Sequence, residues 1–132
     1  ADQKGIKIDI FCQSELKLRT NPLLIEHAIA NLLDNAIKYS NPDSSVYLNA
    51  HREANEVIIR VRDEGCGIPK EHLSRIFERF YRIDKARSRS LGGTGLGLSI
   101  VKNIASAHRG YVTASSQTGR GSIFTIHLPQ KS

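Results

Sequence analysis

Residues 92–102 read GGTGLGLSIVK, with four glycines in the first six positions and a helical pattern of apolar residues from Leu96 onward. Glycine lets the backbone take positive φ and lets a ligand come within hydrogen-bond reach. A glycine-rich turn that leads into a helix presents unpaired N–H groups and the positive end of the helix dipole, which together suit a phosphate chain. The stretch therefore predicts a phosphate-binding loop, with a turn that serves packing alone as the alternative.

Two familiar phosphate-binding motifs do not fit this stretch. No Gly-Lys-Ser or Gly-Lys-Thr closes it, which excludes a Walker loop. A Rossmann fingerprint follows the first strand of a βαβ unit and is followed about 20 residues later by an acidic residue. Here the glycines come late in the chain and no acidic residue follows them, so a different fold must present the loop.

The composition predicts one domain that spans residues 1–132. The length is sufficient for a real core, and 39% hydrophobic with 24% charged residues fits a soluble globular protein. The sequence contains no apolar run of membrane-spanning length and does not open with a signal-peptide pattern. Cys12 and Cys66 are too few for a disulfide framework and lack metal-site spacing, which favours a reducing cytosol.

The chain is basic, with a formal net charge of +6, and residues 70–90 hold seven Lys/Arg against three Asp/Glu. A basic segment can mark a nucleic-acid surface. No nucleic-acid fold motif accompanies this one, so nucleic acid is not an expected partner.

The pattern predicts a helix over residues 22–39, because Asn21-Pro22 is a helix start signal. One face is a core stripe of Ile25, Ile29, Leu32, Leu33 and Ala36. At 100° per residue, an adjacent face gathers Asn31, Asn35, Lys38 and Tyr39. The two amide oxygens could ligate a hard cation such as Mg²⁺, whereas the alternative is an ordinary solvated face.

Alternating apolar residues predict a half-buried strand over residues 6–11 and a short edge strand at residues 16–18. Residues 46–50 and 57–61 form a predicted hairpin around Ala54-Asn55. This hairpin delivers Asp63 to a strand end, before Gly65 and Gly67. A carboxylate there can accept a hydrogen bond from an exocyclic amine, and the glycines let a flat ring approach the backbone. The alternative is an ordinary turn, which has the same sequence pattern.

The remainder is predicted to hold a short helix over residues 70–76, a mobile loop rich in Ser, Gly and Arg, and the helix after the glycine-rich turn. Two further strands are predicted at residues 112–114 and 123–128, with a turn at residues 118–121.

Five motifs follow one another in the sequence: NLLDNAIKYS at 31–40, DEGCG at 63–67, IFERFYR at 76–82, GTGLG at 93–97 and GRGS at 119–122. In this order they resemble the N box, the first glycine box, the F box and the second and third glycine boxes of the ATP-binding catalytic domain of two-component sensor histidine kinases. That family belongs to a wider group shared with gyrase, the ninety-kilodalton heat-shock chaperones and mismatch-repair ATPases. The resemblance implies an α/β fold, a two-layer sandwich with a mixed, mostly antiparallel sheet, helices on one face and a flexible ATP lid.

The resemblance also implies roles for individual residues. Asn35 would hold Mg²⁺ with Asn31 nearby, and Lys38 would meet the phosphates of ATP. Asp63 would bond the adenine amino group, with Ser122 close by in a water-mediated contact. The remaining nucleotide-binding positions would be Tyr39 at the adenine or ribose edge, Gly65, Gly67, Ile68, Gly93, Thr94, Gly95, Leu96, Gly97 and Leu98. Residues 77–94 would form the lid, with Arg79 or Arg82 near the γ-phosphate.

In the family, a dimerising helical hairpin that carries the phosphoacceptor histidine lies upstream. None of the five histidines of this sequence, His27, His51, His72, His108 and His127, sits in a matching motif. The expected partners are therefore ATP, the phosphoacceptor histidine domain of the same kinase and a downstream response regulator, and the isolated domain is expected to be monomeric. A cytoplasmic location is expected, which includes the C-terminal cytoplasmic part of a membrane-anchored sensor.

Two related activities compete with histidine phosphorylation. Gyrase-type ATPases carry a glutamate general base four residues before the Mg²⁺ asparagine, where this sequence has Asn31. An amide cannot take a proton at neutral pH, so phosphoryl transfer to a supplied acceptor fits better than hydrolysis. The anti-sigma-factor serine kinases share the nucleotide site but normally lack so complete an aromatic F box.

Overall fold

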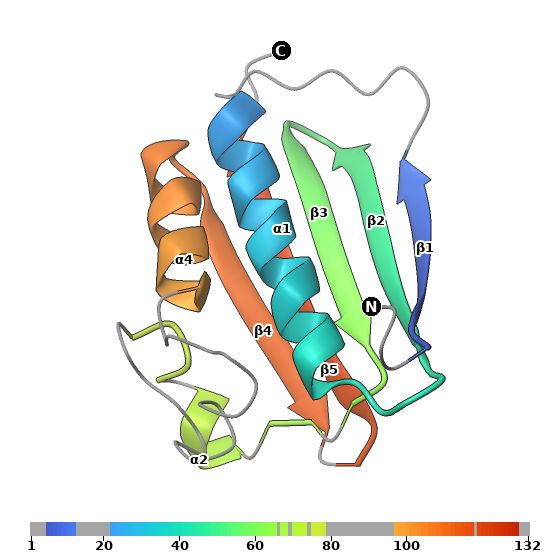
Figure 1. The fold of residues 1–132 in the computed structure, drawn as a ribbon. Coiled ribbons are helices and arrows are strands. Elements are labelled where there is room, and N and C mark those ends of the chain that lie inside the picture. Colours follow the sequence, from blue (N-terminus) through green and yellow to red (C-terminus); the bar gives the residue numbers. More distant parts are fainter. Residues whose placement is uncertain are drawn as a thin grey trace.

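The computed structural model describes residues 5–12, 22–65, 67–68, 70–73, 75–78, 97–117 and 119–129. Along the chain these form β1 (Lys7–Cys12), α1 (Pro22–Tyr39), β2 (Ser45–Glu53), β3 (Glu56–Asp63), α2 (Lys70–Leu73), α4 (Gly97–Ala107), β4 (Tyr111–Gln117) and β5 (Gly121–Pro129) (Figure 1). The strands form one sheet in the order β1-β2-β3-β5-β4. β1 runs parallel to β2 and the other neighbours are antiparallel, as predicted for the mixed sheet.

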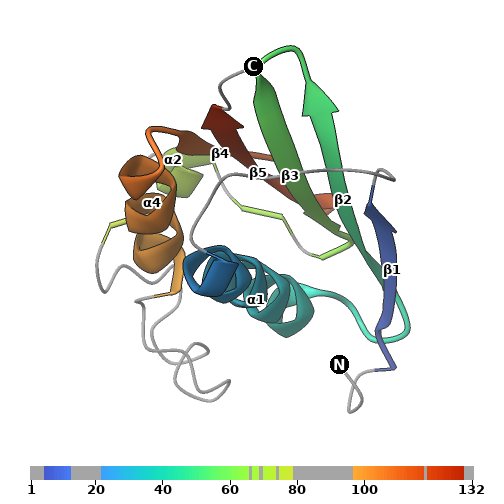
Figure 2. The same cartoon turned by 90° about the horizontal axis from the view of Figure 1, so that it is seen from above.

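Both long helices lie on the same face of the sheet, which confirms the two-layer sandwich (Figure 2). α1 crosses the middle of the sheet and α4 lies beside it. The core between the layers includes Leu32 of α1, Val101 of α4 and Phe124 of β5, all fully buried. Burying a side chain of this size contributes about 1.5–3 kcal/mol to folding, so the predicted apolar stripe of α1 is what holds the helix to the sheet.

α1 spans the predicted residues and ends in a compact turn. Ser40 is buried and donates its hydroxyl to the Ala36 carbonyl oxygen at 2.6 Å, which satisfies one of the last free carbonyls of the helix. Lys38 adds a cation in the last turn, where the helix dipole favours positive charge.

The β2–β3 hairpin forms as predicted, with a turn at Ala54 that takes φ 52°. Val57, Ile59 and Val61 of β3 alternate into the core. Asp63 is the last residue of β3, as predicted, and lies on this same core-facing row.

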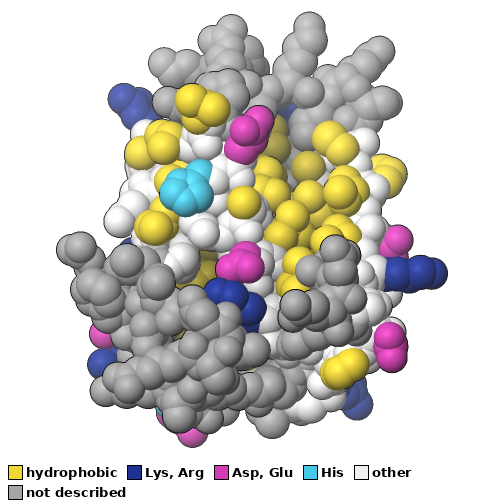
Figure 3. All heavy atoms as spheres, in the orientation of Figure 1, with side chains coloured by type: hydrophobic (Ala, Val, Ile, Leu, Met, Phe, Trp, Pro, Cys, Tyr) yellow, Lys and Arg dark blue, Asp and Glu magenta, His cyan; other side chains and the backbone are white. Residues whose placement is uncertain are grey.

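The first strand forms near the predicted residues, but the prediction that it is half-buried was wrong. All six residues of β1 are exposed, and only Ile6 just before the strand is buried. Ile8 and Ile10 point to the helix side of the sheet, since they pair with Val46 and Leu48. Ile10 is nevertheless 67% exposed, because α1 lies over the middle of the sheet and leaves β1 uncovered. Figure 3 shows hydrophobic side chains along this side of α1.

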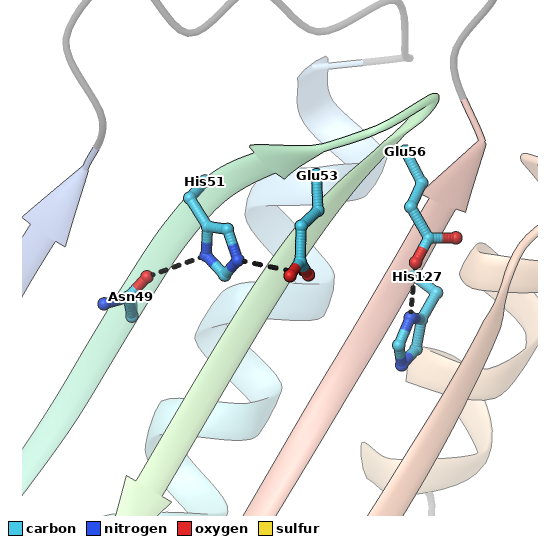
Figure 4. A network of polar contacts seen from close by, with 5 residues as sticks. All are labelled: Asn49, His51, Glu53, Glu56 and His127. Atoms are coloured by element: carbon cyan, nitrogen blue, oxygen red, sulfur yellow. Dashed lines mark hydrogen bonds and ion pairs between the residues drawn. The ribbon is translucent and has the colours of Figure 1, made fainter.

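The opposite face of the sheet carries polar contacts instead of helices (Figure 4). His127 Nδ1 lies 3.0 Å from Glu56 Oε1, and the His127 ring stacks on Tyr111. His51 contacts Asn49 at 3.1 Å. Ile58 lies between the two histidines in the register of the strands and is buried by its neighbours, although it points away from the helices.

Other predictions fall outside the described residues, namely the edge strand at 16–18 and most of the lid, residues 79–94. Along the described part of the chain, no helix combines the length and apolar character needed to cross a membrane.

Candidate nucleotide-binding site

A buried carboxylate forms the centre of the site. Asp63 is 5% exposed and its Oδ1 accepts two backbone N–H groups, from Gly65 at 2.9 Å and from Ser122 at 3.2 Å. These bonds fix the carboxyl group in one orientation. None of the described residues donates to Oδ2, which leaves that oxygen available to a ligand donor.

The pKa of Asp63 is raised above its ordinary value of 3.8. Burial is the largest cause, because it penalises the charged form, and the two backbone N–H bonds oppose it. A buried carboxylate with one oxygen held and one oxygen open is an acceptor aimed at a specific donor, such as an exocyclic amine.

Three strands contribute one polar row at this end of the sheet. Asp63 of β3 pairs with Ser122 of β5, and Ser122 pairs with Ser116 of β4. The Ile68 N–H donates to Ser116 Oγ at 2.6 Å, and Ser116 Oγ lies 2.9 Å from the Gly121 carbonyl oxygen and 3.0 Å from Ser122 Oγ. Ser116 therefore ties the segment after Gly67 to the sheet beside Asp63.

At two glycines a side chain would collide with the neighbouring backbone. A Cβ at Gly65 would collide with the Tyr39 carbonyl oxygen and come within 3.0 Å of Asp63 Oδ1. A Cβ at Gly121, where φ is 115°, would collide with the Asp63 carbonyl oxygen. Only glycine therefore lets these backbones approach the carboxylate so closely.

The C-terminal end of α1 is fastened to the same place. Ser40 and Gly65 form an isolated antiparallel bridge. The Asn41 side chain donates to the Glu64 carbonyl oxygen at 3.1 Å, and Glu64 Oε1 accepts the Ser45 N–H at 2.8 Å. The helix that carries the predicted asparagines and the loop beyond Asp63 thus form one unit.

The polar face of α1 runs from this unit to the start of α4. Lys38 pairs with Asp34 at 3.1 Å, one turn back along the helix. Asn31 lies two turns before Tyr39 on the same helix and beside Gly97, the first residue of α4. A Cβ added at Gly97 would be 3.8 Å from Asn31 Oδ1. Asn31 Nδ2 is buried and has no hydrogen-bond partner among the described residues. An unpaired buried donor at a helix N-terminus suits an anionic ligand group.

The structure brings some predicted site residues together and does not describe others. Asp63, Gly65 and Ser122 are joined by hydrogen bonds, Ile68 joins them through Ser116, and Tyr39 touches Gly65 through its backbone. Asn31 meets Gly97, and Asn35 and Lys38 lie on α1 between these two groups. The predicted positions outside the described residues are Arg79, Arg82, Gly93, Thr94, Gly95 and Leu96.

Sequence reasoning missed Ser116. The available signal was its place in the alternation of β4, where Val112 and Ala114 face the core and a serine follows on the same face. A hydroxyl on a core-facing position needs partners, and here it finds three.

Comparison with known proteins identifies the family. The family model described as Histidine kinase-, DNA gyrase B-, and HSP90-like ATPase matches residues 20–132. The sensor-like histidine kinase SenX3 of Mycolicibacterium smegmatis is 43% identical over 130 residues, which are 98% of this chain and 34% of that protein. The chain therefore spans about a third of the length of this curated relative.

Solved structures agree with this result. The mycobacterial sensor histidine kinase MprB has a TM-score of 0.81 and 28% identity, and the match covers 95% of this chain and 82% of that one. ShkA, solved at full length in complex with AMPPNP, has a TM-score of 0.83 and 29% identity, covering 96% of this chain and 26% of that one. The chain belongs to the histidine kinase-, DNA gyrase B-, and HSP90-like ATPase family, and its relatives group it with the ATPase domains of sensor histidine kinases.

Proposed function

We propose that this chain binds Mg·ATP and transfers the γ-phosphoryl group to a histidine on a separate dimerisation domain, as the catalytic part of a sensor histidine kinase. The observation that carries the proposal is the pairing of two unlike subsites along α1. One is the buried acceptor Asp63 beside closely packed glycines, and the other is the unpaired Asn31 donor at the N-terminus of α4.

In this proposal the adenine amino group donates to Asp63 Oδ2, with Ser122 beside it. Gly65 lets the loop pack closely against the end of α1 beside Asp63, and Gly67 takes φ 80° to turn the chain. The triphosphate extends along α1 toward Gly97, since the dipole of α4 and its unpaired N–H groups favour anions there. Lys38 supplies positive charge between the two ends.

The residues on α1 also fit a nucleotide-borne Mg²⁺. Mg²⁺ keeps several waters and is usually held by one or two protein oxygens together with substrate phosphates. Asn35 is half-buried on the face between Asn31 and Lys38, and its amide oxygen would be the protein ligand. In that place the ion would neutralise charge on the phosphates.

Transfer to a supplied acceptor is favoured over hydrolysis of ATP. Asn31 occupies the place of a general base but carries an amide, which cannot take a proton from water. The Asn31 amide can instead donate to a phosphate oxygen, since no described residue accepts from its Nδ2. The acceptor's proton is then taken by a group outside these residues, on the domain that carries the histidine. Arg79 or Arg82 would add positive charge at the γ-phosphate.

The partners follow from this role. They are the phosphoacceptor histidine domain of the same kinase and, downstream, a response regulator. A cytoplasmic position for this domain follows from its need for ATP, and nucleic acid has no part in the proposal.

Calorimetric titration with Mg·ATP tests the proposal directly. We expect a dissociation constant in the micromolar to millimolar range, about −8 to −4 kcal/mol, and a similar value for Mg·ADP. His51→Ala, on the opposite face of the sheet, is the control and should bind like wild type. The proposal fails if the folded wild-type chain shows no heat of binding up to millimolar Mg·ATP.

A further inference from the structure

We infer that Ser116 sets the base specificity of this site by fixing the direction of the Ser122 hydroxyl. The inference rests on the proposed ATP site and concerns a residue that does not itself touch the nucleotide. Ser116 is thus a positioning residue, which acts through Ser122 and through the Ile68 backbone.

The Ser116 hydroxyl makes three contacts. A serine hydroxyl has one proton to donate and two lone pairs with which to accept. The Ile68 N–H can only donate, so it uses one lone pair of Ser116 Oγ. The Gly121 carbonyl oxygen can only accept, so it receives the proton of Ser116.

This assignment leaves one role for Ser122. With the proton of Ser116 committed to Gly121, the 3.0 Å contact between the hydroxyls requires Ser122 to donate to Ser116. The lone pairs of Ser122 Oγ then remain for the site. Ser122 also donates its backbone N–H to Asp63, so the two side chains stand next to each other in the row across β3 and β5.

A row of two acceptors discriminates between purine bases. Asp63 Oδ2 and Ser122 Oγ both offer lone pairs, which match the amino group of adenine directly or through a water that donates both of its protons to them. The carbonyl group at the same position of guanine offers lone pairs as well and finds no donor at Asp63 or Ser122. Without Ser116, the Ser122 hydroxyl could rotate and donate to that carbonyl. Ser116 therefore rejects guanine without contacting it.

The test measures the ratio of Mg·ATP to Mg·GTP affinity by calorimetry with the full 132-residue chain. Ser116→Ala should lower this ratio about threefold to tenfold, the value of one neutral hydrogen bond, mainly through tighter GTP binding. Ser116→Thr keeps the hydroxyl and should retain the wild-type ratio. Ser115→Ala is the matched control, because Ser115 is the adjacent serine of β4 and is exposed on the opposite face.

Ser116→Cys covers the case in which Ser116→Ala does not fold, since it keeps the size of the side chain with only weak hydrogen bonding. The inference is overturned if the folded variants keep the wild-type ratio of Mg·ATP to Mg·GTP affinity, even if both affinities fall equally. The proposed function would still stand in that case. Wild type that binds neither nucleotide refutes the proposed function, and the inference falls with it.

Discussion

Asp63 shows how a residue can serve the site at a cost to the fold. It is buried, so its charged form is disfavoured, and among the described residues two backbone N–H bonds compensate. Folding alone would be served better by a neutral side chain of the same shape. A buried carboxylate that does not stabilise the core is best explained by ligand binding. Such a residue lowers stability in exchange for activity.

Asp63→Asn should therefore separate stability from binding. The amide oxygen can still accept from Gly65 and Ser122, and no charge is buried, so we expect a melting temperature equal to or above that of wild type. Binding of ATP should weaken by about 1.5–3 kcal/mol, because Oδ2 becomes an N–H₂ donor that faces the adenine amino group. Thermal melts and ATP titrations measure both effects. Equal ATP affinity in variant and wild type would reject the role of Asp63.

The same residue gives the site a pH dependence. Its pKa is raised in the folded chain, so the folded state binds this proton more tightly than the unfolded state does. The contribution of Asp63 to stability is therefore greatest at low pH and falls as the pH rises from 3.8 through the raised pKa. ATP affinity should change in the opposite direction over this window, because the ligand needs the carboxylate.

The difference between wild type and Asp63→Asn isolates this group from the other titrating residues. Melts and titrations at stepped pH should show the two proteins converging in ATP affinity as the pH falls. Parallel curves for the two proteins across the window would contradict the assignment.

Among the elements, α1 combines two tasks on neighbouring faces. One face fills the core through Ala28, Leu32 and Ala36, all of which are fully buried. The adjacent face carries Asn31 and Asn35 past the start of α4. Because the core face anchors the helix, side chains on the polar face can be changed without loss of the fold.

Asn35→Ala should abolish the effect of Mg²⁺ on ATP binding while leaving stability within about 0.5 kcal/mol of wild type. The reason is that the Asn35 amide makes no hydrogen bond to any of the described residues, so its removal costs the fold little. Titrations of ATP with and without Mg²⁺ provide the measurement. Asn103→Ala, an exposed asparagine on α4, is the control. A variant that responds to Mg²⁺ as wild type does would show that Asn35 is not the ligand.

Local patterns predicted much of the fold. The start of α1 at Pro22, the hairpin around Ala54 and the position of Asp63 at a strand end all follow from signals a few residues long, and the structure confirms them. The exposure of β1 could not be predicted in this way. Alternation in residues 6–11 reveals a strand, but whether a helix covers it depends on where α1 crosses the sheet.

The sequence predicted only part of the candidate site, because contacts between segments that are distant in the sequence complete it. Motifs identified Asp63 and Ser122 separately, and the register of β3 with β5 brings them together. The role of Ser116 depends on the register of β4 with β5 and on a segment 48 residues away, so no local pattern contains it. The approach of Gly65 to the end of α1 is likewise a tertiary contact.

At the scale of the whole molecule, the 132 residues should bind ATP but complete no reaction by themselves. Transfer requires an in-line nucleophile and a group to accept its proton, besides the charge that holds the phosphates. No histidine here lies in a phosphoacceptor motif, and Asn31 cannot activate water. With radiolabelled Mg·ATP we expect no stable label on the chain and turnover well below about 1 s⁻¹.

Addition of a helical domain that carries the phosphoacceptor histidine should restore transfer, with an acid-labile phosphate on that histidine. A domain with the histidine replaced by alanine is the matched control. Acid-stable label on the chain itself would favour a serine kinase, and rapid release of inorganic phosphate would favour an ATPase.

The bridge between Ser40 and Gly65 has a consequence for the thermodynamics of binding. In the proposed complex, adenine bound beside Gly65 also restrains the C-terminal end of α1 through this bridge. The phosphates lie along the same helix. Occupancy of one end should then lower the entropic cost of occupying the other, which is positive heterotropic cooperativity. By linkage, adenosine must raise the affinity for Mg·pyrophosphate by the same factor as Mg·pyrophosphate raises the affinity for adenosine. ATP would then bind more tightly than the sum of its two halves implies.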